Sequence, residues 1–224
     1  MAENKKNKQG VPVEAPVEEN FVQKYRKTIG ICVGVVVVLA LAIIGCNSYF
    51  QSQDKKAAEA LYPCQEMFQN GNYEKALNGD GQQVLGFAEV AKKYSSTKSG
   101  NVAKLYAGLS SAQLGNYEEA QKYLKDFSPK DDDMISPAAI AALGNVYAEL
   151  GQNDKAVDNL KKAAKKADNS VLSPLFLVQA GEILEADGKY AEALKLYEEV
   201  KANYRGSQQG NEIDKYIERA KAAN

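Results

Sequence analysis

Three successive aspartates, Asp131–Asp133, form the densest group of side chains in this sequence that could do chemistry. Carboxylate oxygens are ligands that Ca²⁺ prefers in proteins, so the run could hold a divalent cation. A calcium site, however, needs more oxygen ligands at defined spacing. The run lies between Pro129 and Pro137, and we therefore interpret it as a solvated loop. A calcium titration that leaves the thermal midpoint unchanged would exclude the cation site.

Other residues of catalytic type are scarce. The sequence contains no His, which removes the commonest general base and the commonest metal ligand. Cys64 is the single Cys after residue 50, and we expect it to be a small buried side chain rather than a reactive thiol. Gly79 and Gly81 lack the Lys-Ser/Thr pair of a phosphate-binding loop. We therefore expect neither an enzyme nor a cofactor. The formal net charge of −1 gives no reason to expect nucleic acid as a partner.

An apolar segment lies near the N-terminus. Residues 29–45 read IGICVGVVVVLALAIIG, and no charged residue occurs from Thr28 to Gln53. A stretch of this length and composition predicts one transmembrane helix over residues 29–50. Lysines and an arginine precede the segment closely, so the positive-inside rule places the N-terminus in the cytoplasm. We expect residues 1–28 to be a disordered cytoplasmic tail and residues 51–224 to form an exported domain.

Two alternatives for this segment stay open. The segment ends in AIIGC, which resembles the lipobox of bacterial lipoproteins, and cleavage there would make Cys46 the lipidated N-terminus of a membrane-tethered lipoprotein. The long basic region before the segment argues against an ordinary signal peptide. Gly30 and Gly34 form a G-x-x-x-G pattern that would allow a homodimer, although glycine is also simply tolerated in lipid.

One short phrase recurs four times after the apolar segment. It reads GNYEKA (71–76), GNYEEA (115–120), GQNDKA (151–156) and GKYAEA (188–193). The steps from Gly to Gly are 44, 36 and 37 residues, and periods of this size indicate stacked repeats. Strand-type alternation is absent, so the repeats are expected to be helical. We predict helices near residues 54–70, 72–78, 82–94, 100–114, 117–127, 136–150, 154–167, 173–187, 190–203 and 210–222.

The residues within each repeat explain how two helices would pack. In the second repeat Gly108 and Ala112 lie four residues apart on the first helix, and Ala120 lies on the next. Small residues let the two antiparallel helices approach closely, while Tyr117 and Leu124 fill the space between repeats. Equivalent sets are Gly144, Ala148, Ala156 and Leu160, and Gly181, Ala193 and Tyr197. We also expect Asn72, Asn116 and Asn153 to cap helices.

This spacing resembles the tetratricopeptide repeat. The resemblance implies an all-α fold, a solenoid of helical hairpins preceded by one transmembrane helix. The first repeat departs from the pattern because NGDG (78–81) interrupts its second helix, and Asn153 stands where Tyr is usual. The last predicted helix is amphipathic and reads as a C-terminal cap, which repeat arrays require.

Repeat arrays of this kind bind through the concave face formed by the first helices. This face is predicted to be apolar with an acidic end and without Lys or Arg. We therefore expect it to bind a hydrophobic or amphipathic protein segment. The predicted protein-binding residues are Val102, Leu105, Leu109, Gln113, Ala138, Ala141, Asn145, Glu149, Leu175, Val178, Glu182 and Glu185.

The start of the domain narrows the family. The segment GFAEVAKKYSSTKSGNVAKLYAGL (86–109) follows one N-terminal span and one helix. This layout, with Tyr94, Ser95 and Thr97, resembles the YfgM-like ancillary subunits of the bacterial SecYEG translocon. The resemblance implies a single-pass protein of the bacterial inner membrane with a periplasmic repeat domain. The implied partners are translocon subunits, secreted chains or periplasmic chaperones.

Two functional hypotheses follow. In the first, the chain is a translocon accessory or chaperone adaptor that binds proteins through its concave face. In the second, it is a structural scaffold for cell-envelope assembly or division machinery. A stoichiometric complex that survives detergent and lacks any translocon subunit would favour the scaffold.

Overall fold

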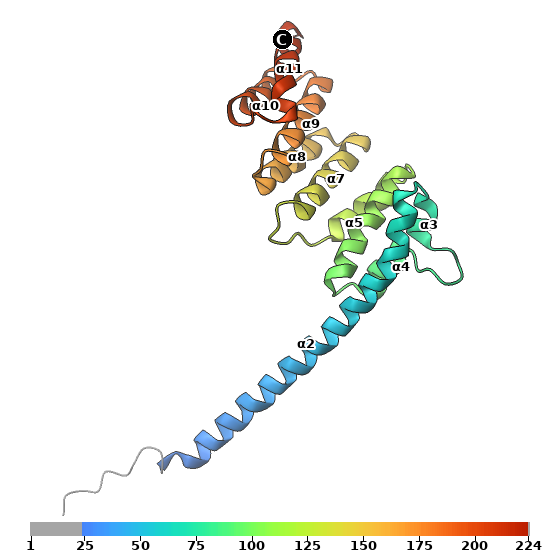
Figure 1. Ribbon diagram of the computed structural model, residues 1–224. Helices are drawn as coiled ribbons and strands as arrows, with labels where there is room; N and C mark the ends of the chain where they lie inside the picture. Colours follow the sequence, from blue (N-terminus) through green and yellow to red (C-terminus); the bar gives the residue numbers. More distant parts are fainter. Residues whose placement is uncertain (1–23, 224) are drawn as a thin grey trace, which may run out of the picture. The chain divides into compact units, whose positions relative to one another are not determined.

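The computed structural model describes residues 24–223 (Figure 1). Most of the predicted tail, residues 1–28, lies outside the described residues, but helix α2 already begins at Arg26. The described part of the chain is almost entirely helical, and its one β-type pairing is an isolated bridge between Gly79 and Leu85. The prediction of an all-α fold is therefore confirmed.

Helix α2 (Arg26–Gln69) joins two predicted helices into one. We predicted the span over 29–50 and a helix near 54–70 as separate elements, whereas the structure has one continuous helix. The intervening Gln51, Ser52 and Gln53 carry no helix-breaking residue type, and the helix continues through them. Within residues 24–223, α2 is the one helix that is long and apolar enough to cross a membrane.

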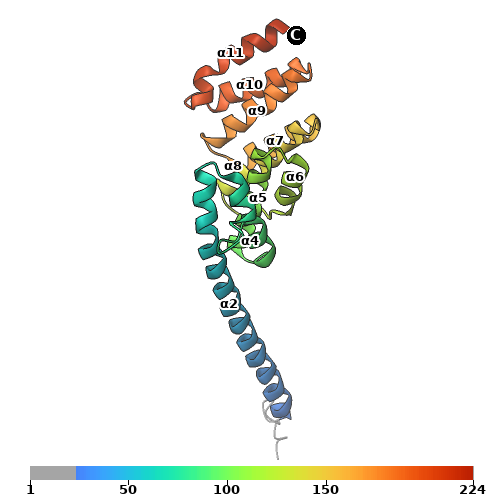
Figure 2. The same ribbon diagram turned by 90° about the vertical axis from the view of Figure 1, so that its right-hand side faces the viewer.

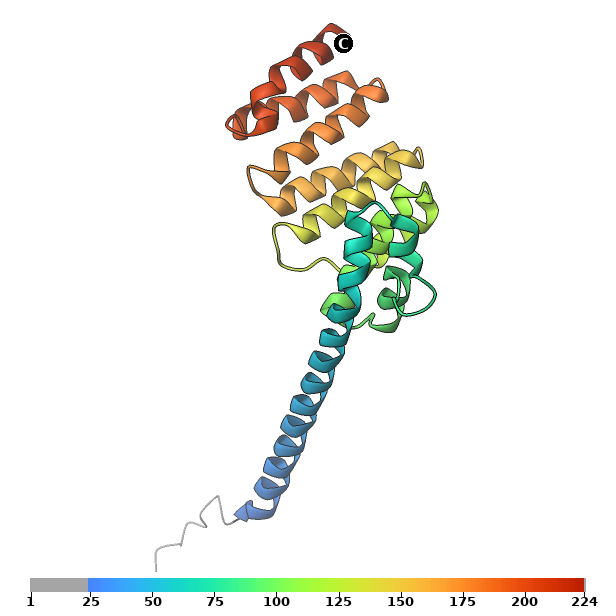
Figure 3. The ribbon, with the colours of Figure 1, turned by 45° about the vertical axis from the view of Figure 1, so that its right-hand side comes forward.

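The chain divides between Ser48 and Tyr49 into two compact units. The second unit contains the rest of α2 and a series of helical hairpins. Figure 3 shows α7 and α8, and then α9 and α10, as antiparallel pairs that stack on one another. The helices after α2 are α3 (Tyr73–Asn78), α4 (Phe87–Lys93), α5 (Lys98–Gln113), α6 (Tyr117–Asp126), α7 (Ile135–Glu149), α8 (Asn153–Ala167), α9 (Leu172–Ala186), α10 (Tyr190–Asn203) and α11 (Gln208–Ala223).

The glycine of the recurring phrase ends the first helix of each hairpin. Gly115 has a φ of +78°, a left-handed conformation that favours glycine. The amide of Asn116 then bonds back to the Ser111 carbonyl at 2.9 Å, which closes the last turn of α5. Gly151 and Gly188 have the same conformation, with φ values of +69° and +72°. The recurring phrase therefore forms the turn of each hairpin and the start of its second helix.

The predicted small residues lie where two helices of a hairpin approach closely. A Cβ on Gly108 would lie 2.6 Å from Leu124 Cγ, and a Cβ on Gly181 would lie 2.3 Å from Tyr197 Cε1. Gly144 faces Leu160 in the same way at 3.1 Å. Because the large partner fills the space that the glycine leaves, the helices pack without a void.

The first repeat differs from the others, as predicted. The helix that follows its interruption, α4, is shorter than predicted. The prediction of a helix over 82–94 is wrong at its start, because residues 79–86 form a loop and α4 begins at Phe87. In this loop the Asp80 carboxylate accepts bonds from the amides of three following residues at 2.8 to 2.9 Å. Cys64 donates its thiol to the Leu85 carbonyl at 2.6 Å. Cys64 is fully buried, and burial raises the pKa of its thiol to about 11, so its expected role as a small core side chain is confirmed.

The three predicted asparagine caps are not formed. Asn72 and Asn116 stand directly before α3 and α6, but neither side chain bonds to the helix. Asn153 is the first residue of α8, and its side-chain amide donates to Asp187 at the next hairpin turn. It therefore connects two successive repeats rather than capping its own helix.

Side chains in the loop before α7 fix the start of that helix. Asp132 accepts bonds from the amide of Ser136 at 2.9 Å and from the Ser136 hydroxyl at 2.5 Å. Pro137 follows in the first turn of α7, where proline is tolerated. Burial alone would raise the pKa of Asp132, but the hydrogen bonds from Ser136, Met134 and Ile135 together outweigh burial and hold that pKa below its usual value. Among residues 24–223 no group of three or more His, Cys, Asp or Glu gathers as a metal site. The Asp132 carboxylate thus acts as a helix cap.

Replacement of Asp132 by Asn is expected to destabilise the domain at neutral pH by about 1 kcal/mol, because the amide keeps one acceptor oxygen but loses the charge and the second oxygen that accepts from the Ser136 hydroxyl. Because the folded state holds the pKa of Asp132 low, this stability is present above the ordinary pKa and is lost as the pH falls through the lowered value. The difference between wild type and Asp132→Asn in denaturant unfolding should therefore shrink below about pH 4. Asp133→Asn is the control, since the Asp133 side chain is exposed and caps nothing. Equal effects of the two substitutions would contradict the capping role.

Candidate protein-binding surface

A cleft with a volume of about 380 Å³ lies where the second hairpin meets the third. Helix α6 packs against both α5 and α7 there (Figure 2). We call this cavity the α5–α7 cleft. It is open to solvent at one side, and its size falls in the range of protein ligand pockets. Its lining residues are Leu109, Ala112, Gln113, Tyr117, Leu124, Ala142, Asn145, Val146 and Glu149.

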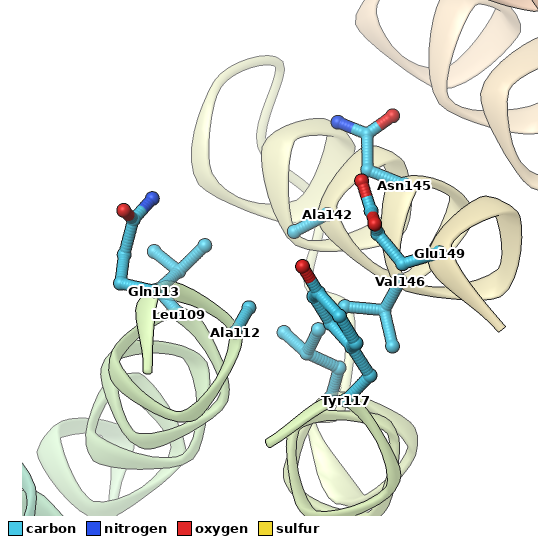
Figure 4. Close-up of a pocket in the computed structure, with 9 residues that line it drawn as sticks. Leu109, Ala112, Gln113, Tyr117, Ala142, Asn145, Val146 and Glu149 are labelled. Carbon is cyan, nitrogen blue, oxygen red and sulfur yellow. The ribbon is translucent and has the colours of Figure 1, made fainter. Parts of the chain in front are cut away.

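The cleft has an apolar floor and a polar rim. Leu124 and Val146 are 4% and 3% exposed and belong to the core beneath the cleft. Gln113 at the end of α5 and Asn145 on α7 are exposed at its edges. Figure 4 shows the side chains of α5 on one side, those of α7 on the other, and the Tyr117 ring between them. A pocket of this kind can bury an apolar group and bond to polar groups next to it.

Tyr117 reaches the cleft because the turn at Gly115 places it at the start of α6. Its hydroxyl points toward the carboxylate of Glu149 at the end of α7 (Figure 4). The negative charge of Glu149 raises the pKa of Tyr117, so the hydroxyl stays protonated. Glu149 is the one charged side chain that lines the cleft, and it makes no ion pair within residues 24–223. The lining thus combines apolar side chains with one carboxylate, which suits the binding of an amphipathic ligand.

The structure brings four of the predicted binding residues together in this cleft. Leu109 and Gln113 come from α5, and Asn145 and Glu149 come from α7. Leu109 is partly buried and packs on the core, so its outer part alone faces the cleft. These residues occupy corresponding positions on two successive first helices.

Three other predicted residues are buried and not available to a partner. Leu105, Ala141 and Val178 are 7%, 3% and 5% exposed and pack inside the repeat domain. Val102 is partly buried and packs against the core of the first repeat. These side chains lie on the predicted helices but point toward neighbouring hairpins, so the predicted face is narrower than expected.

The predicted residues of α9 lie outside the cleft. Leu175 lines a separate cavity of about 450 Å³ beside the loop before α11. Glu182 is exposed. Glu185 forms an ion pair with Arg219 of α11, so its charge is compensated. Ala138 on α7 is exposed but does not line the cleft. We expected no Lys or Arg at this end of the face, which is wrong because α11 supplies Arg219.

Sequence reasoning missed two features of the surface. It assigned Tyr117 to packing between repeats, although this residue also lines the cleft. It also missed a second recurring phrase, Y-x-x-[ST]-x-x-G-N, which begins at Tyr94 and again at Tyr204. In both copies the Ser/Thr hydroxyl donates to the Tyr carbonyl and accepts from the Gly amide at 2.7 to 2.9 Å. Helix α11 therefore starts in the same way as α5, the first helix of the second hairpin.

Comparison with known proteins agrees with this architecture. The family model described as a tetratricopeptide repeat-like domain matches residues 19–218. The ancillary SecYEG translocon subunit of Aggregatibacter actinomycetemcomitans is 28% identical over 176 residues, which are 75% of this chain and 80% of that protein.

Solved structures share the arrangement of hairpins at low sequence identity. The TPR-like repeats of a kinesin light chain-type protein from Podosopora anserina align with a TM-score of 0.58 at 18% identity, over 79% of this chain and 87% of that chain. The MamA protein aligns with a TM-score of 0.53 at 17% identity, over 75% of this chain and 91% of that chain. These likenesses concern the fold alone. Because the family model covers most of its length, this chain belongs to the tetratricopeptide repeat-like domain family.

Proposed function

We propose that this chain is a membrane-anchored accessory subunit of a bacterial protein-export translocon, and that it binds other proteins through the α5–α7 cleft. The observation that carries the proposal is the cleft itself, with its apolar floor and one carboxylate, Glu149, whose charge no ion pair of the described residues compensates. Stacked helical repeats usually bind through such surfaces between first helices. The similarity to an ancillary SecYEG translocon subunit supports the translocon as the place of action.

In this proposal, α2 crosses the bacterial inner membrane once and the repeat domain lies in the periplasm. Lys24, Arg26 and Lys27 precede the apolar segment, and the positive-inside rule favours a cytoplasmic N-terminus. The exposed aromatic residues Tyr49 and Phe50 follow the apolar segment, as is typical of a membrane–water interface.

The chemistry of the cleft favours an amphipathic segment as the ligand. An apolar side chain of the ligand would cover Leu124 and Val146, and a Lys or Arg next to it would meet Glu149. Secreted chains in transit and periplasmic chaperones are the classes of partner that this proposal names. Binding of an apolar group in a groove with charge complementarity at its edge is a common mode of peptide recognition.

Site-specific photocrosslinking in membranes tests the proposal. A photoreactive residue replaces Gln113 at the rim of the cleft, in the full chain. The matched control replaces Lys162 of α8, which is also exposed but does not line the cleft. We expect the Gln113 position to capture translocon subunits, secreted chains or periplasmic chaperones, and the Lys162 position not to capture them.

A second substitution shows whether the cleft itself is responsible. Asn145→Trp adds a large ring at an exposed position on the opposite wall, so it should fill the cleft without disturbing the core. Capture from position 113 should then fall about tenfold or more, as expected for a binding hot spot. Capture that is equal at both positions, or unchanged by Asn145→Trp, would show that the cleft is not the binding surface.

A further inference from the structure

A second, smaller cavity lies at the beginning of the second unit. It has a volume of about 120 Å³, and Tyr49 and Phe50 line it together with Lys93, Tyr94 and Thr97. We call residues 92–99, between α4 and α5, the α4–α5 corner. Tyr49 and Phe50 are 61% and 48% exposed, although both are large aromatic residues. Exposed aromatic side chains directly after an apolar span are typical of the membrane–water interface.

The α4–α5 corner is fixed to α2 at the level of these aromatic residues. The Asp54 carboxylate accepts a bond from the amide of Ser99 at 2.7 Å. Asp54 lies one helical turn after Phe50, which corresponds to about 6 Å along the helix axis. Thr97 is 8% exposed and caps α5, so the backbone of the corner is held firmly. The corner therefore lies within a few ångströms of the aromatic pair along α2.

Lysines outnumber carboxylates in the two segments near Tyr49 and Phe50, residues 49–56 and 89–99. None of the five lysines in residues 49–56 and 89–99 forms an ion pair or donates a hydrogen bond within the described part of the chain. The same two segments contain two carboxylates, Asp54 and Glu89, and Asp54 is already bonded to Ser99. Lys93 lies over the Tyr94 ring at 5.5 Å. The five exposed lysines are Lys55, Lys56, Lys92, Lys93 and Lys98.

We propose that the α4–α5 corner, together with Lys55 and Lys56, contacts the anionic phospholipid head groups of the leaflet that borders Tyr49 and Phe50. This inference rests on the membrane anchoring proposed above, but not on the direction in which the span crosses. Lys55 and Lys56 follow Phe50 by about 8 Å along the helix. The head-group layer extends about 5 to 8 Å beyond the hydrocarbon core. The lysines therefore lie within about one Debye length of the lipid phosphates.

The membrane span of α2 makes the weak attraction between these lysines and the lipid phosphates effective. A single exposed lysine near an anionic surface contributes little by itself, but the span keeps the corner at the membrane permanently. Contact would hold the first repeat, with its irregular loop, against the lipid. The lysines of α8 form an equally basic surface, but they lie on a later hairpin, so they serve as an internal reference.

Lysine acylation of the full chain in lipid nanodiscs tests the proposal. Discs of phosphatidylcholine alone are compared with discs that also contain phosphatidylglycerol, and the acylation rate of each lysine is measured by mass spectrometry. We expect Lys92, Lys93 and Lys98 to react about fivefold more slowly in the anionic discs, relative to Lys161, Lys162 and Lys165 of α8. High salt should abolish the difference.

Charge reversal provides the matched comparison. In the Lys92→Glu/Lys93→Glu variant, the protection of Lys98 and Lys56 in anionic discs should be lost. In Lys165→Glu/Lys166→Glu, which changes the charge equally on α8, the protection should remain.

Equal acylation in both kinds of disc would overturn the proposal. Protection that appears only after a membrane protein extract is added would also overturn it, and would indicate an acidic protein partner. Failure of the anchoring itself would be distinguishable, because the protein would then be missing from the disc fraction.

Discussion

Gly100→Ala is expected to lower the free energy of unfolding of the repeat domain by about 3 kcal/mol, at the upper end of the usual cost of overpacking. A Cβ on Gly100 would lie 1.9 Å from the carbonyl oxygen of Tyr94. That carbonyl cannot move away freely, because it accepts bonds from both the amide and the hydroxyl of Thr97 at 2.9 Å. The clash therefore breaks the corner that joins α4 to α5.

The sign of this effect is informative. In a helix without steric conflict, replacing Gly by Ala stabilises by about 1 kcal/mol. A destabilisation at Gly100 would therefore show that the close approach of the two backbones outweighs the ordinary helix preference. The thermal midpoint of the full chain, in detergent or nanodiscs, should fall by roughly 6 to 12 °C.

Gly206→Ala is the matched control. Gly206 also lies in a corner before a helix, but a Cβ there would meet no heavy atom within 4 Å. We expect Gly206→Ala to leave the thermal midpoint unchanged or slightly raised. Gly210 corresponds to Gly100 in the second copy of the phrase, and its Cβ would lie 2.1 Å from the Tyr204 carbonyl. If Gly100→Ala or Gly210→Ala raised the midpoint, the role assigned to the Y-x-x-[ST]-x-x-G-N phrase would be wrong.

The hairpins could be predicted from the sequence because their determinants are local. The phrase that starts at Gly115 contains its own turn residue, and the small residue Gly108 and the large Leu124 recur at fixed distances from it. Each of these residues acts through a neighbour in the same hairpin. A pattern of this kind is visible in a single sequence without any knowledge of distant contacts.

The start of α4 could not be predicted in this way. The apolar residues from Val84 to Ala91 fit a helical period, and the sequence alone does not show that residues 79–86 leave the helix. The loop depends on contacts between separate elements, such as the bond from Cys64 to the Leu85 carbonyl. A Cβ on Gly86 would lie 2.1 Å from the Leu77 carbonyl, so this glycine is needed for a close approach between backbones. The spacing of apolar residues along the sequence does not reveal such a close approach between backbones.

Only part of the candidate binding surface could be predicted from the sequence, and the reason is related. Sequence spacing identifies the first helices, but burial on each helix depends on how neighbouring hairpins are rotated against each other. Leu105 and Leu109 lie one turn apart on α5, yet Leu105 is in the core and Leu109 borders the cleft. Arg219 reaches Glu185 from a helix that the sequence identified only as a cap.

A double-mutant cycle at Gly108 and Leu124 is expected to show strong coupling between the two helices of one hairpin. Leu124→Ala should destabilise the domain by about 3 kcal/mol, because Leu124 is 4% exposed and its loss leaves a cavity. Gly108→Ala should cost about 2 kcal/mol through overpacking. The double variant should be less destabilised than the sum of the two, by about 1 to 2 kcal/mol.

The geometry explains why the two changes should compensate each other. The two nearest atoms to a Cβ on Gly108 are Leu124 Cγ at 2.6 Å and Cδ2 at 2.9 Å, and both are removed by Leu124→Ala. The third-nearest atom is the Ala120 carbonyl oxygen at 3.3 Å, a tight contact that a shift of a few tenths of an ångström would relieve. The new methyl group can then occupy part of the cavity that the leucine leaves. Denaturant unfolding of the four proteins in detergent gives the coupling free energy directly.

The control for this cycle combines changes in different hairpins. Gly108→Ala with Leu160→Ala joins sites that share no partner, because Leu160 faces Gly144. These two effects should add, as independent sites usually do. If the Gly108 and Leu124 effects were equally additive, the pairing of small and large residues would not be what holds each hairpin together. The walls of the α5–α7 cleft depend on that pairing, because Leu124 is part of its floor and α5 carries one of its sides.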